Sequence, residues 1–179
     1  PTAAVGNQAN VTSAPVLPAV VGTTLANGLG VAPDGASLFY ISMRPLADGT
    51  GSGAHVTRYR VADGTYTHVP VTEPSTSVAG AVNPVTGNFY YGGVAGGAVI
   101  YMFEPSTARH FAVGTVPGGG LGNGDYAFTS SGDLHILGDD TITVVRAADL
   151  PSTQGSGPLV GTPVTTTVAM MARVHSRIA

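Results

Sequence analysis

The sequence predicts an all-β chain built from three copies of one strand-rich unit. In each copy a glycine-bounded turn leads into a short run of aliphatic and aromatic residues, at residues 30–41, 80–91 and 125–136. The 26 glycines and 13 prolines punctuate the whole chain, and no long segment has the 3.6-residue apolar period of a helix.

The spacing of the turn glycines indicates how the units are arranged. Gly35, Gly87 and Gly132 follow one another at intervals of 52 and 45 residues. Repeats of about 40–50 residues with several strands each are typical of β-propeller blades. We therefore expect a β-propeller-like array of about three four-stranded blades, which forms an incomplete ring.

The first blade is expected at residues 29–73, after an N-terminal extended segment or edge strand at residues 1–28. Its strands are predicted at residues 29–32, 38–43, 56–61 and 66–71. Alternation in the third strand places Thr57 and Tyr59 on one face and Arg58 on the other. The glycine-rich residues 44–54 are expected to form a long loop.

The second and third blades are expected at residues 78–116 and 125–168, followed by a partial strand or tail at 169–179. Their strands are predicted at residues 78–82, 89–93, 98–103, 110–116, 126–129, 134–137, 141–146 and, loosely placed, 159–168. Residues 118–124 lack the Gly-Lys-Ser/Thr ending of a phosphate loop, so they are interpreted as a connector. Residues 151–158 are expected to be a long, flexible connection.

Composition limits the classes of partner that the chain is expected to bind. Charged residues make up only 9%, against about 25% in an average domain, all seven positive residues are arginine, and the net charge is −3. Nucleic acid is therefore not expected as a partner, and no apolar run is long enough for a membrane span. An uncharged polar surface favours an extracellular or cell-surface location, where the sequon at Asn10 would be a candidate glycosylation site.

Three segments carry a resemblance to a known family: residues 81–87, 122–128 and 144–150. They resemble the propeller-like repeats of large actinobacterial cell-surface proteins, and the resemblance covers residues 29–150. In that family the repeats usually continue for more blades and often precede prealbumin-like stalk domains. The resemblance implies an extracellular surface role and supplies no catalytic residues.

Candidate metal ligands are limited to Asp139 and Asp140, the one adjacent acidic pair. Paired carboxylates can hold calcium, which makes calcium a possible cofactor. The alternating pattern of a calcium loop is absent, and turn formation by aspartate explains the pair more simply. With no cysteine in the chain, disulfides, thiolate metal sites and a cysteine nucleophile are excluded.

Candidate ligand-binding residues are His55, Arg58, Arg60 and His135. The five histidines form no short-spaced pair, and repeated positions on different blades are not expected to converge. Tyrosine and phenylalanine cluster on the second strand of the first two units, where packing between blades explains them best. The absence of tryptophan weakens a carbohydrate-binding interpretation without excluding it.

Three functional hypotheses follow from this pattern. The first is a non-catalytic secreted or cell-surface module, whose open ends are completed by self-association, by a larger assembly or by further chain. The second is a propeller that binds carbohydrate or a small ligand. The third is a hydrolase or lyase with a site at the axial mouth, formed by residues 44–54 and 94–97.

Overall fold

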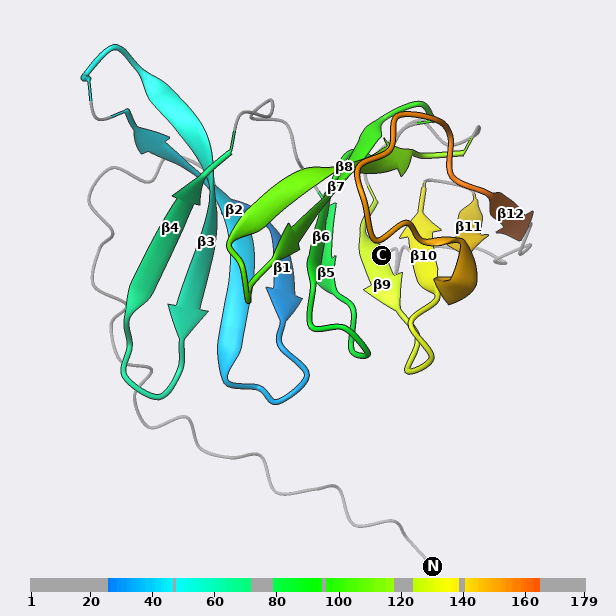
Figure 1. Ribbon diagram of the computed structural model, residues 1–179, viewed down its shortest axis with the longest axis horizontal. Coiled ribbons are helices and arrows are strands. Elements are labelled where there is room, and N and C mark those ends of the chain that lie inside the picture. Colours follow the sequence, from blue (N-terminus) through cyan, green and yellow to red (C-terminus); the bar gives the residue numbers. More distant parts are fainter. Residues whose placement is uncertain are drawn as a thin grey trace, which may run out of the picture.

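A computed structural model of the chain describes residues 26–46, 48–71, 79–94, 96–117, 124–138 and 141–164 (Figure 1). These residues form three four-stranded antiparallel sheets and one short 3-10 helix, which confirms the all-β prediction. No helix within these ranges is long and apolar enough to cross a membrane. The strands predicted before residue 26, the tail at 169–179 and Asn10 lie outside the described residues.

Each sheet is a simple meander in which strands pair in sequence order. Blade 1 contains β1 (Ala26–Val31), β2 (Ser37–Pro45), β3 (Ser52–Arg60) and β4 (Tyr66–Pro70). Blade 2 contains β5 (Ala79–Val82), β6 (Phe89–Gly92), β7 (Val99–Glu104) and β8 (Arg109–Thr115). Blade 3 contains β9 (Tyr126–Phe128), β10 (Leu134–Leu137), β11 (Ile142–Val145), the 3-10 helix η1 (Ala147–Asp149) and β12 (Gly161–Val164).

The first strands of the three blades lie side by side, β1 against β5 and β5 against β9 (Figure 1). Glycine makes this approach possible, because a Cβ on Gly80 would lie only 2.4 Å from the carbonyl oxygen of Gly28. The backbone N–H of Gly80 also donates to Asp125 Oδ1 at 3.1 Å, which ties β5 to the start of β9. The sheets thus radiate from a common line, which is the arrangement of propeller blades.

Each blade has two faces, which we name by the neighbour they meet. The N-side face is turned toward the preceding blade and the C-side face toward the next one. Phe39 on the C-side face of blade 1 packs on Phe89 of blade 2, with ring centroids 5.8 Å apart. Tyr90, on the C-side face of blade 2, packs in the same way near Phe128 of blade 3.

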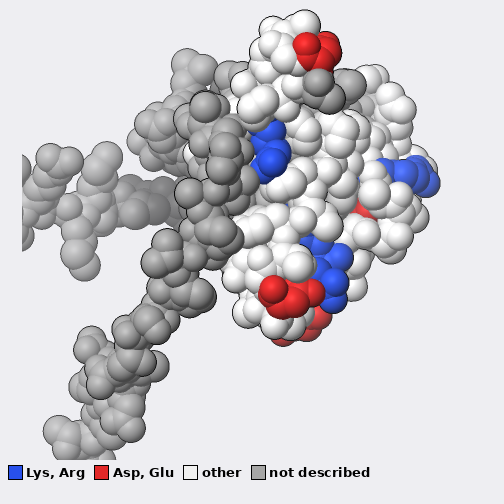
Figure 2. All heavy atoms as spheres, turned by 90° about the vertical axis from the view of Figure 1, so that its left-hand side faces the viewer, with Lys and Arg blue, Asp and Glu red and all other residues white. Residues whose placement is uncertain are grey.

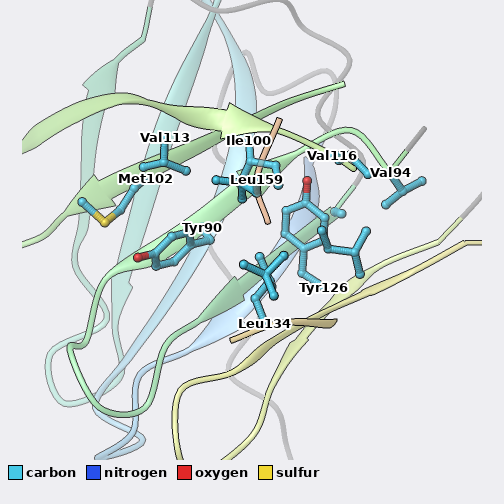
Figure 3. Packing of buried hydrophobic residues seen from close by; sticks show 12 residues of the cluster. Tyr90, Val94, Ile100, Met102, Val113, Val116, Tyr126, Leu134 and Leu159 are labelled. Carbon is cyan, nitrogen blue, oxygen red and sulfur yellow. The ribbon is translucent and has the colours of Figure 1, made fainter. Parts of the chain in front are cut away.

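Two apolar clusters fill the spaces between the blades. The cluster between blades 1 and 2 includes Phe39, Ile41, Val56, Phe89 and Phe103. The cluster between blades 2 and 3 includes Tyr90, Met102, Tyr126, Leu134 and Leu159 (Figure 3). Burial of these side chains, rather than pairing within one sheet, is what holds the array together.

The expected loop at residues 44–54 is wrong in extent. β2 runs to Pro45 and β3 begins at Ser52, so the two strands form a long hairpin that extends beyond the other sheets (Figure 1). The turn is closed by Asp48 Oδ1, which accepts hydrogen bonds from the N–H and the hydroxyl of Thr50, and by Gly49 at φ +72°. This local turn chemistry frees the other glycine-rich residues to pair as strands.

The long connection expected at residues 151–158 is present, and its second half is hydrogen-bonded to blade 2. The segment 155–159 (the strap) runs parallel to the outer edge of β8. Gly155 N–H donates to Ala112 O at 2.9 Å, and Leu159 N–H donates to Thr115 O at 3.0 Å. Prolines and glycines suggested flexibility, but the unpaired edge of β8 gives this segment hydrogen-bond partners.

Candidate functional site: the N-side face of blade 1

The strand registers identify equivalent positions in the three blades. On the N-side faces, the second strands carry Leu38 and Tyr40 in blade 1, Phe89 and Tyr91 in blade 2, and Leu134 and Ile136 in blade 3. All six side chains are apolar or aromatic. The repeat therefore builds the same kind of face on every blade, including the first.

Burial separates blade 1 from the other two. Phe89 and Tyr91 are fully buried against blade 1, whereas Leu38 and Tyr40 are only partly buried. Val31, beside Leu38, is 54% exposed. Within the described residues, no blade packs on the N-side face of blade 1.

A chain of polar side chains crosses this face. Ser42 Oγ lies 2.7 Å from Thr57 Oγ1, and Thr57 Oγ1 lies 2.9 Å from His68 Nδ1. Arg44 Nη1 donates to the same Nδ1 at 3.4 Å. Because a guanidinium can only donate, Nδ1 accepts, and the proton of the neutral ring is on Nε2.

The surroundings keep His68 neutral. Partial burial lowers its pKa below the usual value, and the positive charge of Arg44 and the neighbouring His55 lower it further. His55 Nδ1 donates to the carbonyl oxygen of Gly53 at 3.0 Å. Arg44 therefore supplies the permanent positive charge of this cluster.

Aromatic rings flank the polar chain. Tyr59 and Tyr66 lie with ring centroids 4.9 Å apart, and Tyr66 stacks on His68 at 6.1 Å with an interplanar angle of 7°. Burial raises the pKa of Tyr40, with a smaller contribution from Tyr66, so its hydroxyl stays protonated at neutral pH. The face thus combines a row of rings with hydroxyl, imidazole and guanidinium groups.

Charged groups are sparse on this side of the molecule (Figure 2). In the described parts of the chain, ion pairs join Arg60 to Asp63 and Arg146 to Asp133. No carboxylate of those residues lies within ion-pair distance of Arg44. The side chain to which its guanidinium donates a hydrogen bond there is the neutral ring of His68.

The four predicted ligand-binding residues do not form one site. His55 lies in the cluster with Arg44 and His68. Arg58 is on the opposite face of the sheet, where it stacks over Phe39 and its Nε donates to Ser37 Oγ. Arg60 is exposed beside Asp63, and His135 belongs to blade 3.

The metal candidates Asp139 and Asp140 lie outside the described residues, and calcium remains a prediction. Within the described ranges, no three His, Asp or Glu side chains gather as a metal site would require. Aspartates on either side of the third turn have structural partners: Asp125 accepts from Gly80 N–H, and Asp133 accepts from the N–H of Ala147 and from Arg146.

The arrangement is suited to binding more than to nucleophilic catalysis. The hydroxyls linked to His68 by hydrogen bonds are those of Thr57 and, through it, Ser42, whose residues are 0% and 1% exposed. They hold the imidazole but cannot reach a substrate. The partly exposed groups, Arg44 and the tyrosines, are donors and ring surfaces.

Sequence reasoning missed Arg44, Tyr40 and Tyr66 as members of this face. The signal that could have found them is the pairing of β2 with β3, in which Tyr40 faces Thr57 and Ser42 faces His55. The register could not be derived from the sequence, because the glycine-rich residues at the hairpin tip did not indicate how far the two strands extend.

No protein-family model matches the chain, and no curated protein matches it. Among solved structures it is similar to an auxiliary nutrient-binding protein from Bacteroides thetaiotaomicron (12% identity, TM-score 0.49), with 78% of this chain and 31% of that one covered. It is similar to the β-propeller domain of the Trilobed protease from Pyrococcus furiosus (6%, 0.49), with 80% and 44% covered. A third is Kuenenia stuttgartiensis hydrazine synthase (14%, 0.46), with 82% and 46% covered. The chain spans less than half the length of each.

These likenesses are too distant to carry a function. The assignment to a propeller-like class stands on the three radiating sheets themselves. The actinobacterial cell-surface resemblance stays a prediction.

Proposed function

We propose that the chain is a non-catalytic interaction module that associates with a second copy of itself through the faces of its end blades. The observation that carries the proposal is the N-side face of blade 1. It has apolar and aromatic residues at the positions that blades 2 and 3 bury, namely Leu38 and Tyr40. At the joints within the chain, an N-side face packs against the C-side face of the preceding blade. The C-side face of a blade from another copy is therefore the surface expected to fit the N-side face of blade 1.

Blade 3 offers such a face at the other end of the array. Leu137 and Ile142 are paired across β10 and β11 and partly exposed, and Val164 is 41% exposed. Leu137 and Ile142 occupy the positions of Ile41 and Val56, which pack against blade 2. Blade 3 of one copy can therefore meet blade 1 of another as blade 1 meets blade 2.

Head-to-tail contact of this kind is heterologous, and it closes only as a ring. Two chains of three blades would supply six blades, a number typical of closed propellers. Closure would cover both end faces at once, which supports a dimer over an open filament.

Light scattering at micromolar concentration tests this proposal. We expect the mass of two chains for the unmodified protein and a monomer for Leu38→Arg and for Leu137→Arg. Val85→Arg, on an exposed turn of blade 2, is the matched control and should remain dimeric. A folded chain that stays monomeric across the concentration range would overturn the proposal.

Mixing the two variants distinguishes head-to-tail association from face-to-face association. Leu38→Arg keeps an intact blade 3 face, and Leu137→Arg keeps an intact blade 1 face. An equimolar mixture should regain a dimer through one good joint if the contact is head-to-tail. A mixture that remains monomeric would contradict head-to-tail association, because a face-to-face contact needs the same surface on both chains.

An extracellular or cell-surface location is part of the same proposal. Its support is compositional: 9% charged residues, no lysine and no cysteine. Protease treatment of intact source cells provides the test. We expect the chain to be cleaved, whereas protection until the cells are lysed would contradict the location.

A further inference from the structure

The polar cluster at the base of the β2–β3 hairpin is a departure from the repeat. Threonine is found at the position of Thr57 in blade 3 also, as Thr143. On the next strand blade 1 has His68, whereas blades 2 and 3 have Ala112 and Pro163. Packing between blades does not need an imidazole at this position, since blade 2 packs with alanine. Departures from an otherwise consistent pattern are expected at functional sites.

Position sets this cluster apart from the apolar joint. β6 and β10 end at Gly92 and Leu137, which correspond to Ile41, whereas β2 continues for four more residues to Pro45. Arg44 and its neighbour His55 therefore lie beyond the strand length of the other blades. A second copy docked on Leu38 and Tyr40 would leave this end of the face at the rim of the joint. Tyr66 and His68 would also lie at the rim, because they belong to the outermost strand, β4.

We propose that this rim is a binding site for a carboxylate-bearing saccharide, such as an oligosaccharide of uronic acids. Arg44 supplies a permanent positive charge with no carboxylate partner in the described chain, and a guanidinium matches a carboxylate in two parallel hydrogen bonds. The Nε2–H of neutral His68 adds a donor for sugar oxygens.

The rings complete the match to a sugar. Tyr66 and His68 on β4 form a continuous ring surface, with Tyr66 parallel to the imidazole within 7°. The C–H face of a pyranose ring packs on such a surface, and partly exposed tyrosine offers both a ring and a hydroxyl. A phosphate or nucleic acid is a poorer fit, because Arg44 is the one permanent cation that the described residues place in this cluster.

Buried hydrogen bonds hold the donors in place before a ligand arrives. Thr57, which is fully buried, fixes His68 Nδ1, and Ser42 fixes Thr57 in turn. Pre-organised donors lose less conformational entropy on binding than mobile ones do. The site belongs to one blade of one chain, so it does not depend on the proposed dimer.

Calorimetric titration with oligogalacturonate, neutral galacto-oligosaccharide and acetate tests the site. We expect the acidic oligosaccharide to bind and the other two to bind at least about tenfold more weakly, because each lacks either the charge or the ring. Equal affinity for the neutral sugar, equal affinity for acetate, or no binding of the acidic sugar at millimolar concentration would each overturn the proposal.

Variants locate the site on the fold. Arg44→Gln should weaken binding about tenfold or more, as loss of a charge-assisted contact predicts. Tyr66→Leu should weaken it and Tyr66→Phe should not. Arg109→Gln is the matched control, since Arg109 is also an arginine beside an aromatic ring. Unchanged affinity in Arg44→Gln, with its fold confirmed by circular dichroism, would overturn the assignment.

The monomeric Leu137→Arg chain separates the two proposals. Its blade 1 is unaltered, so it should bind the acidic saccharide as the unmodified chain does. Binding by a chain that never dimerises would disprove only the association. A dimer that does not bind acidic saccharides would disprove only the site. Loss of saccharide binding in Leu137→Arg would contradict a site built from blade 1 alone.

Discussion

The N-side faces of blades 1 and 2 occupy equivalent positions and meet different surroundings. Phe89 and Tyr91 on blade 2 are completely buried, whereas Leu38 and Tyr40 on blade 1 remain partly open. Both faces keep apolar or aromatic second strands, but only blade 1 adds the hydrogen-bonded Thr57 and His68. The end face of blade 1 thus has the apolar positions of an internal joint together with a polar margin that the internal joint lacks.

The largest expected effect is at the equivalent pair Phe89 and Leu38. Phe89→Ala should lower the free energy of unfolding by about 3–5 kcal/mol, because the ring is fully buried between two blades. Leu38→Ala should cost about 1 kcal/mol in the monomer, since only part of that side chain is buried. Urea titrations at a concentration that keeps the chain monomeric measure both, and equal losses would contradict the contrast.

The joint between β1 and β5 is tested by adding one methyl group. Gly80→Ala places a Cβ against the backbone of Gly28, and backbone cannot rotate away as a side chain can. We expect a loss of about 1–3 kcal/mol in thermal or urea unfolding. Gly157→Ala is the control, because nothing lies within 4 Å of its added Cβ. Similar stabilities for both variants would argue against tight packing of these strands.

The polar margin of blade 1 is tested by Thr57→Val, which keeps the shape and removes the hydroxyl. Ser42 Oγ and His68 Nδ1 would each lose a buried partner, at a cost of about 1–2 kcal/mol. Thr143→Val, at the equivalent buried position of blade 3, is the matched control and should cost less. An unchanged urea midpoint in Thr57→Val would show that the hydrogen-bond chain contributes nothing to stability.

The smallest effect is confined to alkaline pH and to the joint between blades 2 and 3. Burial raises the pKa of Tyr90 to about 12 and also raises that of Tyr126. Above pH 10 the unfolded chain loses phenol protons that the folded chain keeps, so stability present below pH 10 should fall as the pH rises toward 12. Melting temperature against pH measures this fall, which Tyr90→Phe should make shallower.

Much of this fold could be predicted from the sequence. The same turn in each blade is marked by a glycine with a positive φ, namely Gly35, Gly87 and Gly132. Strand positions followed, because alternation of apolar residues reports the buried faces directly. The extent of the β2–β3 hairpin was predicted wrongly, and the hydrogen bonds of the strap were not predicted. Both have one cause: glycine-rich segments form hydrogen bonds to distant or local partners that composition does not indicate.

The site was less accessible to prediction than the fold. His55 was identified, but its neighbours Arg44 and His68 come from β2 and β4, and only the strand register brings them together. Arg58 was a candidate ligand-binding residue, yet its guanidinium stacks on Phe39 at the joint with blade 2. Residue type alone does not tell which face of a sheet a cation occupies, or what covers that face.

The strap on β8 has a consequence for the order in which the molecule opens. It starts from blade 3, bonds to the outer edge of blade 2 and buries Leu159 between them. Separation of blade 3 from blade 2 must therefore break the hydrogen bonds of the strap as well as the apolar cluster between the two blades. Blades 2 and 3 are expected to exchange their amide hydrogens as one cooperative unit. Blade 1, which no such strap ties to blade 2 in the described residues, should exchange first.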